Sequence, residues 1–188
     1  MKETQKKNLT RVLVAGSVLG GIALVASSFR RNKPLETVQK VDLSRYLGKW
    51  YEIAAFPARF EKNCTCTTAE YTLNDDGTIR VDNRCYNAKK EKWEKASGKA
   101  IVQDETTNAQ LAVQFFWPFK GDYFIIALAD DYSYALVGEP TRKYLWILSR
   151  LPQLSEGTFD QLTAIATEKG FDVSKLRRTE QKNCLPQS

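Results

Sequence analysis

The sequence predicts an all-β fold, an eight-stranded antiparallel up-and-down β-barrel with one α-helix after the last strand. Short runs of alternating apolar and polar residues follow one another, separated by turn signals such as Asn74-Asp75-Asp76-Gly77. Because only short connections join these runs, neighbouring strands are antiparallel, and closing them into a barrel removes exposed sheet edges. After the eighth run the apolar spacing becomes helical. A β-sandwich of similar strand count is the alternative.

The first strand begins around Trp50, after a short 3₁₀ turn expected over residues 44–47. Seven further strands are expected at residues 67–73, 79–86, 93–102, 111–116, 122–128, 132–137 and 144–149, with a loop over 117–121. Ser155 is the expected helix N-cap, and Gly170 ends the helix. The apolar face of that helix consists of Phe159, Leu162, Ile165 and Ala166. It would cover one side of the barrel.

The Gly48-Lys49-Trp50 segment suggests how one end of the barrel is sealed. Gly48 lets the chain turn sharply, and the Trp50 indole is the largest apolar group that the chain can place there. We therefore interpret Trp50 as a plug at the closed end. An ordinary core tryptophan at the start of a strand is the alternative.

Composition indicates one packed domain behind a distinct N-terminal segment. The chain has 188 residues, 43% hydrophobic and 11% aromatic, which is enough for a core. The net charge of +6 arises entirely within residues 1–33, which carry seven bases and one acid. The remainder is nearly neutral, so no nucleic-acid partner is expected.

The N-terminal segment has the layout of an export signal. A basic start precedes an apolar run over residues 12–26, followed by small residues and a basic cluster. We expect residues 1–28 to be a signal peptide, or else an N-terminal membrane anchor formed by residues 12–28. Residues 29–41 are expected to be a linker, and residues 42–188 the folded domain. The protein is thus predicted to be exported to the periplasm or cell envelope.

Cysteine usage agrees with export. The chain has four cysteines and no histidine, and an even cysteine count in an oxidising compartment favours disulfides. A zinc site would need all four thiolates, and Cys64-Thr65-Cys66 is too tight for the usual spacing. We expect no metal and no cofactor.

Three blocks occur in an order typical of one family: Gly48-Lys49-Trp50-Tyr51-Glu52, Asp131-Tyr132-Ser133-Tyr134-Ala135-Leu136-Val137 and Tyr144-Leu145-Trp146-Ile147-Leu148-Ser149-Arg150. On these blocks the chain resembles the lipocalins over residues 41–185. Within the family it is most similar to the bacterial lipocalins related to apolipoprotein D, notably in Phe56-Pro57-Ala58-Arg59-Phe60-Glu61. Members of that group commonly carry a lipid-modified cysteine directly after the apolar run, and no cysteine stands at that place here.

The resemblance implies structural roles for several residues. Arg150 would pack its guanidinium across Trp50, a stack that is physically favourable. The structural motif then comprises Gly48, Trp50, Asp131, Tyr132 and Arg150, and none of these is catalytic.

The resemblance also pairs Cys66 with Cys184. Cys64 and Cys85 remain as a second pair. Strand alternation places Cys64 outward and Cys85 inward, so this second bridge needs a bulge or a changed register.

The predicted barrel would hold one small hydrophobic ligand, a fatty acid or lysophospholipid. Alternation selects an apolar cavity wall made of Phe56, Phe60, Tyr71, Leu73, Val81, Leu111, Val113, Phe115, Tyr123, Ile125, Tyr134 and Trp146. Basic residues at the rim, which are Arg59, Lys62 and Lys120, would pair with a charged head group. Membrane association is expected through the N-terminus, and the protein would be a monomer or a weak homodimer.

Two other functions are compatible with such a barrel. One is an enzyme acting on a lipid, but the absence of histidine removes the commonest general base. A carboxylate pair such as Glu52 with Glu70 could act instead. However, a position on an exposed face of the barrel explains each of these charged residues more simply than catalysis does. We therefore expect no catalytic residues. The other alternative is a structural envelope protein with a filled barrel.

Overall fold

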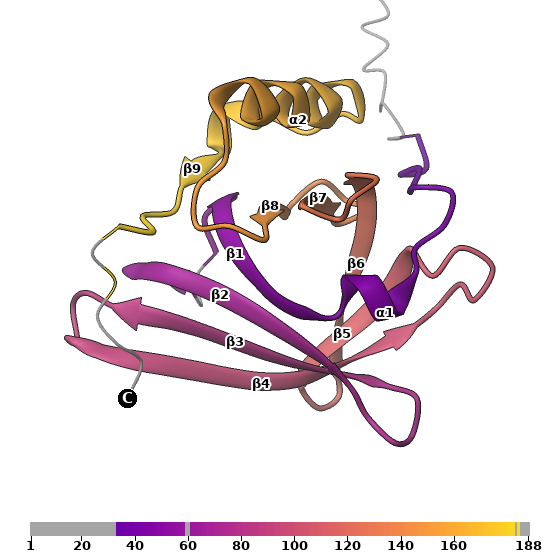
Figure 1. The fold of residues 1–188 in the computed structure, drawn as a ribbon, viewed down its shortest axis with the longest axis horizontal. Helices are drawn as coiled ribbons and strands as arrows, with labels where there is room; N and C mark the ends of the chain where they lie inside the picture. The colour runs from indigo at the N-terminus through magenta and orange to yellow at the C-terminus, as the bar shows by residue number, and fades with distance from the viewer. Residues whose placement is uncertain (1–32, 59–60, 183, 185–188) are drawn as a thin grey trace, which may run out of the picture. The chain divides into compact units, whose positions relative to one another are not determined.

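A closed β-barrel forms the body of the protein, as the sequence predicts (Figure 1). A computed structural model describes residues 33–58, 61–182 and 184. Chain contacts divide the protein into residues 1–31 and 32–188, and every described residue belongs to the second unit. The predicted signal peptide and the first part of the predicted linker therefore lie outside the described residues.

Eight strands follow one another as an antiparallel meander, and β1 pairs with both β8 and β2 to close the barrel. The strands are β1 (Gly48–Ala55), β2 (Cys64–Leu73), β3 (Ile79–Asn87), β4 (Lys92–Val102), β5 (Gln110–Phe116), β6 (Phe119–Leu128), β7 (Tyr134–Gly138) and β8 (Leu145–Ser149). A short helix, α1 (Leu43–Tyr46), precedes β1, where the sequence predicts a 3₁₀ turn. The predicted loop at residues 117–121 is shorter, because β6 already begins at Phe119.

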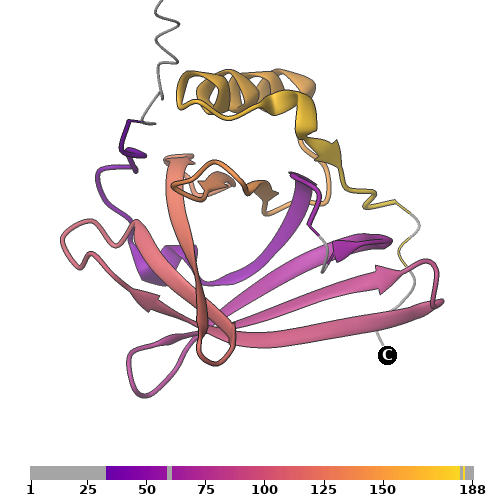
Figure 2. The same cartoon turned by 180° about the vertical axis from the view of Figure 1, so that it is seen from behind.

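Helix α2 (Glu156–Glu168) lies over β7, β8 and the end of β1 in both views (Figures 1 and 2). The predicted cap is present, since the Ser155 hydroxyl accepts a hydrogen bond from the Thr158 backbone amide at 3.1 Å. Gly170 follows the helix with φ of +86°, a conformation that favours glycine.

The chain after α2 contains two elements that the sequence pattern did not predict, η2 (Val173–Lys175) and β9 (Arg177–Arg178). On the edge of β1 opposite β8, β2 is the partner only from Gly48 to Tyr51. Further along that edge, at Ala54 and Ala55, the partner is β9. The tail then contacts both strands, because the Gln181 side chain donates to the carbonyls of Glu52 and Thr67, each at 2.8 Å. The C-terminal tail thus fills a seam between β1 and β2.

Bulges interrupt four of the strand pairings. They lie between Glu52 and Ala54 (β1 with β8), Thr65 and Thr68 (β2 with β3), Val113 and Phe116 (β5 with β6), and Ile125 and Ala127 (β6 with β7). Each extra residue reverses which side chains of its strand face the barrel interior.

Two apolar clusters result, one inside the barrel around Trp50 and one outside it, between the wall and α2. Phe56 and Tyr134, predicted to line the cavity, belong to the outer cluster. The bulge in β1 turns Phe56 outward, where its ring packs edge-on against the Phe171 ring with 6.2 Å between the two ring centroids. Tyr134 is outward because its neighbour Ala135 faces the interior.

The predicted linker is part of the packed structure from residue 33 onward. Leu35 is buried in the outer cluster and Val41 in the inner one. The amide of Val38 donates to the Ile125 carbonyl at 3.0 Å, and that of Val41 to the Thr107 carbonyl at 2.7 Å.

Both predicted disulfides are present, Cys64 with Cys85 and Cys66 with Cys184. The bulge that the first bridge requires lies in β2 between Thr65 and Thr68. It brings Cys64 to the same face as Cys85. Cys66, at φ of +53° within the bulge, instead points toward the tail.

Candidate functional site

The floor of the barrel is built around Trp50, which is fully buried. The guanidinium carbon of Arg150 lies 3.8 Å from the centroid of the indole, as the resemblance implies. The same guanidinium donates to the carbonyls of Arg45 at 2.7 Å, Lys49 at 2.8 Å and Tyr46 at 3.1 Å. The cation therefore joins β8 to both α1 and β1 and seals this end.

The other motif residues hold the loop beside this floor. The Asp131 carboxylate accepts from the Ser133 amide at 2.9 Å, and hydrogen bonds from the Ser133 side chain and amide lower the pKa of Asp131. Tyr132 accepts from the Asp42 amide at 2.8 Å, and the Arg45 guanidinium lies 4.1 Å from its ring centroid. Gly48 has φ of +89°, a left-handed conformation that favours glycine. A Cβ there would lie 3.5 Å from Arg150, which is an ordinary contact, so the backbone conformation and not a shortage of space requires the glycine.

Three tyrosine hydroxyls lie above the floor. Tyr123 shares hydrogen bonds with Tyr46 at 2.8 Å and with Tyr71 at 2.9 Å. Burial raises the pKa of Tyr71 to about 12 and the pKa values of the other two well above the ordinary value, so all three stay protonated. Three hydroxyls have three hydrogens and make two bonds with one another, so one hydrogen is left to donate elsewhere. Of this group, the sequence pattern did not single out Tyr46.

Most predicted wall residues do face the interior. Those in the inner cluster are Tyr71, Val81, Leu111 and Ile125, which are buried, and Val113, Phe115, Tyr123 and Trp146, which are partly exposed. These four side chains keep part of their surface accessible to solvent, and Phe115 also borders a surface hollow beside Gln114. Gly98 makes room for the Phe115 ring, since a Cβ there would lie 2.8 Å from it.

The remaining candidate residues fall into three groups. Leu73 is 56% exposed, because it lies at the end of β2 beyond the closed end, so it does not line the cavity. Lys62 and Lys120 are exposed. Phe60 and Arg59 lie outside the described residues.

One side of the interior is polar. Glu52 on β1 is 7% exposed, and its carboxylate accepts a hydrogen bond from the Thr179 hydroxyl of the tail. Burial raises the pKa of Glu52. Burial, with the nearby Glu52 charge, raises the pKa of Glu61 to about 8, although a hydrogen bond from Trp146 opposes that shift.

Two further polar side chains lie at inward positions of β2 and β3. Thr67 is 8% exposed, and its hydroxyl has no hydrogen-bond partner among the described residues. The same holds for the side-chain oxygen of Asn83. Glu70, considered with Glu52 as a carboxylate pair, is exposed on the opposite face of β2, so the two do not meet. No spacing in the sequence marks Glu61 as the real neighbour.

Comparison with known proteins decides the family. A model of the lipocalin-like domain matches residues 41–181. The chain belongs to the lipocalin family. It is 46% identical over 164 residues to outer membrane lipoprotein Blc of Citrobacter freundii, covering 87% of this chain and 93% of that protein. It is 35% identical over 153 residues to bovine apolipoprotein D, covering 78% and 80% of the two chains.

The fold of this lipocalin also matches solved structures. Insecticyanin from the tobacco hornworm superposes with a TM-score of 0.66 at 22% identity, covering 82% of this chain and 88% of the other. At that identity the likeness concerns the fold alone. No helix in the described ranges has the length and apolar character needed to cross a membrane.

Proposed function

We propose that this lipocalin is a noncatalytic binding protein that carries one single-chain lipid, a fatty acid or lysophospholipid, inside its barrel. The observation that supports this most directly is the inner wall. Val113 and Trp146 face the interior and yet remain partly exposed. An apolar surface that water reaches inside a barrel gains free energy when an acyl chain covers it. A structural protein with a filled barrel would have no such surface.

The proposed location is the cell envelope. Two relatives carry the name outer membrane lipoprotein, and their length is almost fully matched by this chain. The apolar run at residues 12–26 would serve either as an export signal or as the anchor. We infer that the protein acts at a membrane surface, where single-chain lipids are found.

A displacement titration tests cargo binding. A fluorescent fatty acid is bound to the full chain and displaced by palmitate or by lysophosphatidylethanolamine. We expect saturable binding at micromolar concentration. Val113→Trp fills the interior and should abolish it, whereas Gln114→Trp, one residue further along β5 and on its outer face, should not. Equal binding by both variants, or no saturable binding by the wild type, would refute the proposal. Mass spectrometry of lipid extracted with the native protein would identify the cargo.

A further inference from the structure

The turn between β5 and β6 displays aromatic side chains to solvent. Phe116 is 75% exposed, Trp117 86% and Phe119 75%. Phe116 and Phe119 face each other as a cross-strand pair, and the turn between them consists of Trp117 and Pro118. Folding leaves three large apolar groups together in water, which is unfavourable unless another apolar phase covers them.

Two lysines lie near this turn. Lys120 follows Phe119 directly, and Lys99 lies on β4, where it pairs in register with Gln114 of β5. Neither lysine makes a salt bridge within the part of the chain that the structure describes. Two lysines without salt bridges therefore flank three exposed aromatic rings.

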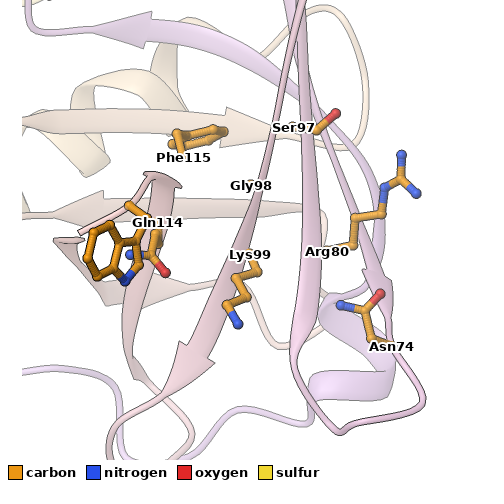
Figure 3. A pocket seen from close by; sticks show the side chains of 8 residues that line it. Asn74, Arg80, Ser97, Gly98, Lys99, Gln114 and Phe115 are labelled. Carbon is orange, nitrogen blue, oxygen red and sulfur yellow. The ribbon is translucent and has the colours of Figure 1, made fainter. Parts of the chain in front are cut away.

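A hollow of about 430 Å³ lies between the turn and Lys99, since Trp117 and Lys99 both line it. Trp117 lines one side of it, and Figure 3 shows Lys99 between Gln114 and the pair Arg80 and Asn74. Its polar lining offers cationic and amide donors of the kind that bind phosphate oxygens. The side of the hollow that carries Arg80 and Lys99 lies on the outer face of the sheet, because these residues alternate with the inward residues Val81 and Ala100.

We propose that the β5–β6 turn inserts into the surface of an anionic bilayer, with Trp117 and the two phenylalanines among the acyl chains and Lys99 and Lys120 at the lipid phosphates. This contact is separate from any anchoring by residues 1–28, and it does not depend on which cargo the barrel holds. Aromatic residues next to lysines are the side chains that favour the membrane interface.

A bilayer explains the surface better than a protein partner. A stable protein interface buries about 800 Å² on each side, and a turn of two residues with one flanking pair is a small convex tip. A bilayer needs no complementary pocket, and its interface accommodates such a tip together with the surrounding cations.

The test follows Trp117 itself in the full chain. Vesicles of equimolar phosphatidylcholine and phosphatidylglycerol carry brominated acyl chains, which quench indoles that enter the bilayer. The chain has four tryptophans, so Trp117→Phe identifies the share of the quenching that belongs to this residue. We expect that share to be large and the access of aqueous iodide to Trp117 to fall severalfold with vesicles. Quenching that persists unchanged in Trp117→Phe would overturn the proposal, because it would arise from cargo lipid beside the inner tryptophans.

Two pairs of variants test the chemistry. Phe116→Ser combined with Phe119→Ser should reduce quenching of Trp117 severalfold, whereas Leu151→Ser, which removes another exposed apolar side chain, should not. Binding of the fluorescent fatty acid should survive in both, which separates failure of docking from failure of the proposed cargo function. Undiminished quenching in the double variant would refute insertion through the turn.

The charge component has its own control. Lys99→Gln with Lys120→Gln should abolish the preference for vesicles that contain phosphatidylglycerol over pure phosphatidylcholine. Lys143→Gln, which removes an exposed cation from the β7–β8 connection, should leave that preference intact. If the two sets behave alike, the lysines do not contact the phosphates.

Discussion

Replacing Arg150 by lysine tests whether the closed end is held by a cation over an indole or by the hydrogen bonds of that cation. Lysine keeps the charge but replaces the planar fork of donors with one compact ammonium group. It cannot reach the carbonyls of Arg45, Lys49 and Tyr46 together, although all three lie within 3.1 Å of the guanidinium nitrogens. Hydrogen bonds to charged groups contribute about 1.5–3 kcal/mol each and are not additive, so we expect a loss of about 2–4 kcal/mol.

Arg178 provides a matched control. Its guanidinium carbon also lies over an aromatic ring, 3.4 Å from the centroid of Phe159, and it pairs with Glu156. It is exposed, and among the described residues its guanidinium donates to no cluster of backbone carbonyls, so Arg178→Lys should cost less than about 1 kcal/mol.

The assay is equilibrium unfolding in guanidinium chloride with both disulfides intact, followed by tryptophan emission. The midpoint should fall in Arg150→Lys with an unchanged slope. If Arg150→Lys and Arg178→Lys cost the same, stacking alone explains the contact and the reasoning from hydrogen bonds fails.

Three further predictions concern other parts of the fold. Because the pKa of Glu61 is about 8 in the folded protein against 4.5 for the free side chain, the free energy of unfolding should fall as pH rises from about 4.5 to 8. Glu61→Gln should flatten that slope in pH-dependent denaturation, and an unchanged slope would show that this carboxyl is not the cause. Replacing Cys66 and Cys184 by serine opens a loop of 118 residues and should cost about 2–5 kcal/mol, measured by urea unfolding; a cost near zero would mean that the tail holds the seam without its bridge. Gly138→Ala places a Cβ 2.5 Å from the Phe171 ring and should cost about 1–3 kcal/mol in thermal unfolding. Gly121→Ala, whose Cβ would have nothing within 4 Å, should be nearly neutral.

The strand order and the closing helix could be predicted because they depend on local patterns. Alternation, turn residues and the Ser155 cap each act within a few residues of sequence. The Arg150–Trp50 contact came from the family resemblance, and the structure supplies its physical reason in the three carbonyls that Arg150 also holds.

The cavity wall could be predicted only where strands are regular. Alternation counted from Trp50 places Phe56 inside, but one extra residue between Glu52 and Ala54 reverses the face of everything after it. No residue in that stretch is a glycine or proline that would signal a bulge. The tail could not be predicted for a similar reason. Strand β9 is only two residues long, and its pairing depends on the separation of β1 from β2, which lie far from it in the sequence.

The two ends of the barrel are therefore built differently. At the closed end, Arg150 joins α1, β1 and β8 through backbone carbonyls, so side-chain exchange there disturbs three elements together. Toward the other end, β1 leaves β2 after Tyr51, and the gap is filled by a tail held by the two-residue strand β9, the Gln181 side chain and the disulfide at Cys66. Segments with few backbone bonds to the sheet open at lower free energy than the core. Local opening should thus begin at this seam, beside the buried Glu52, and leave the floor around Trp50 intact.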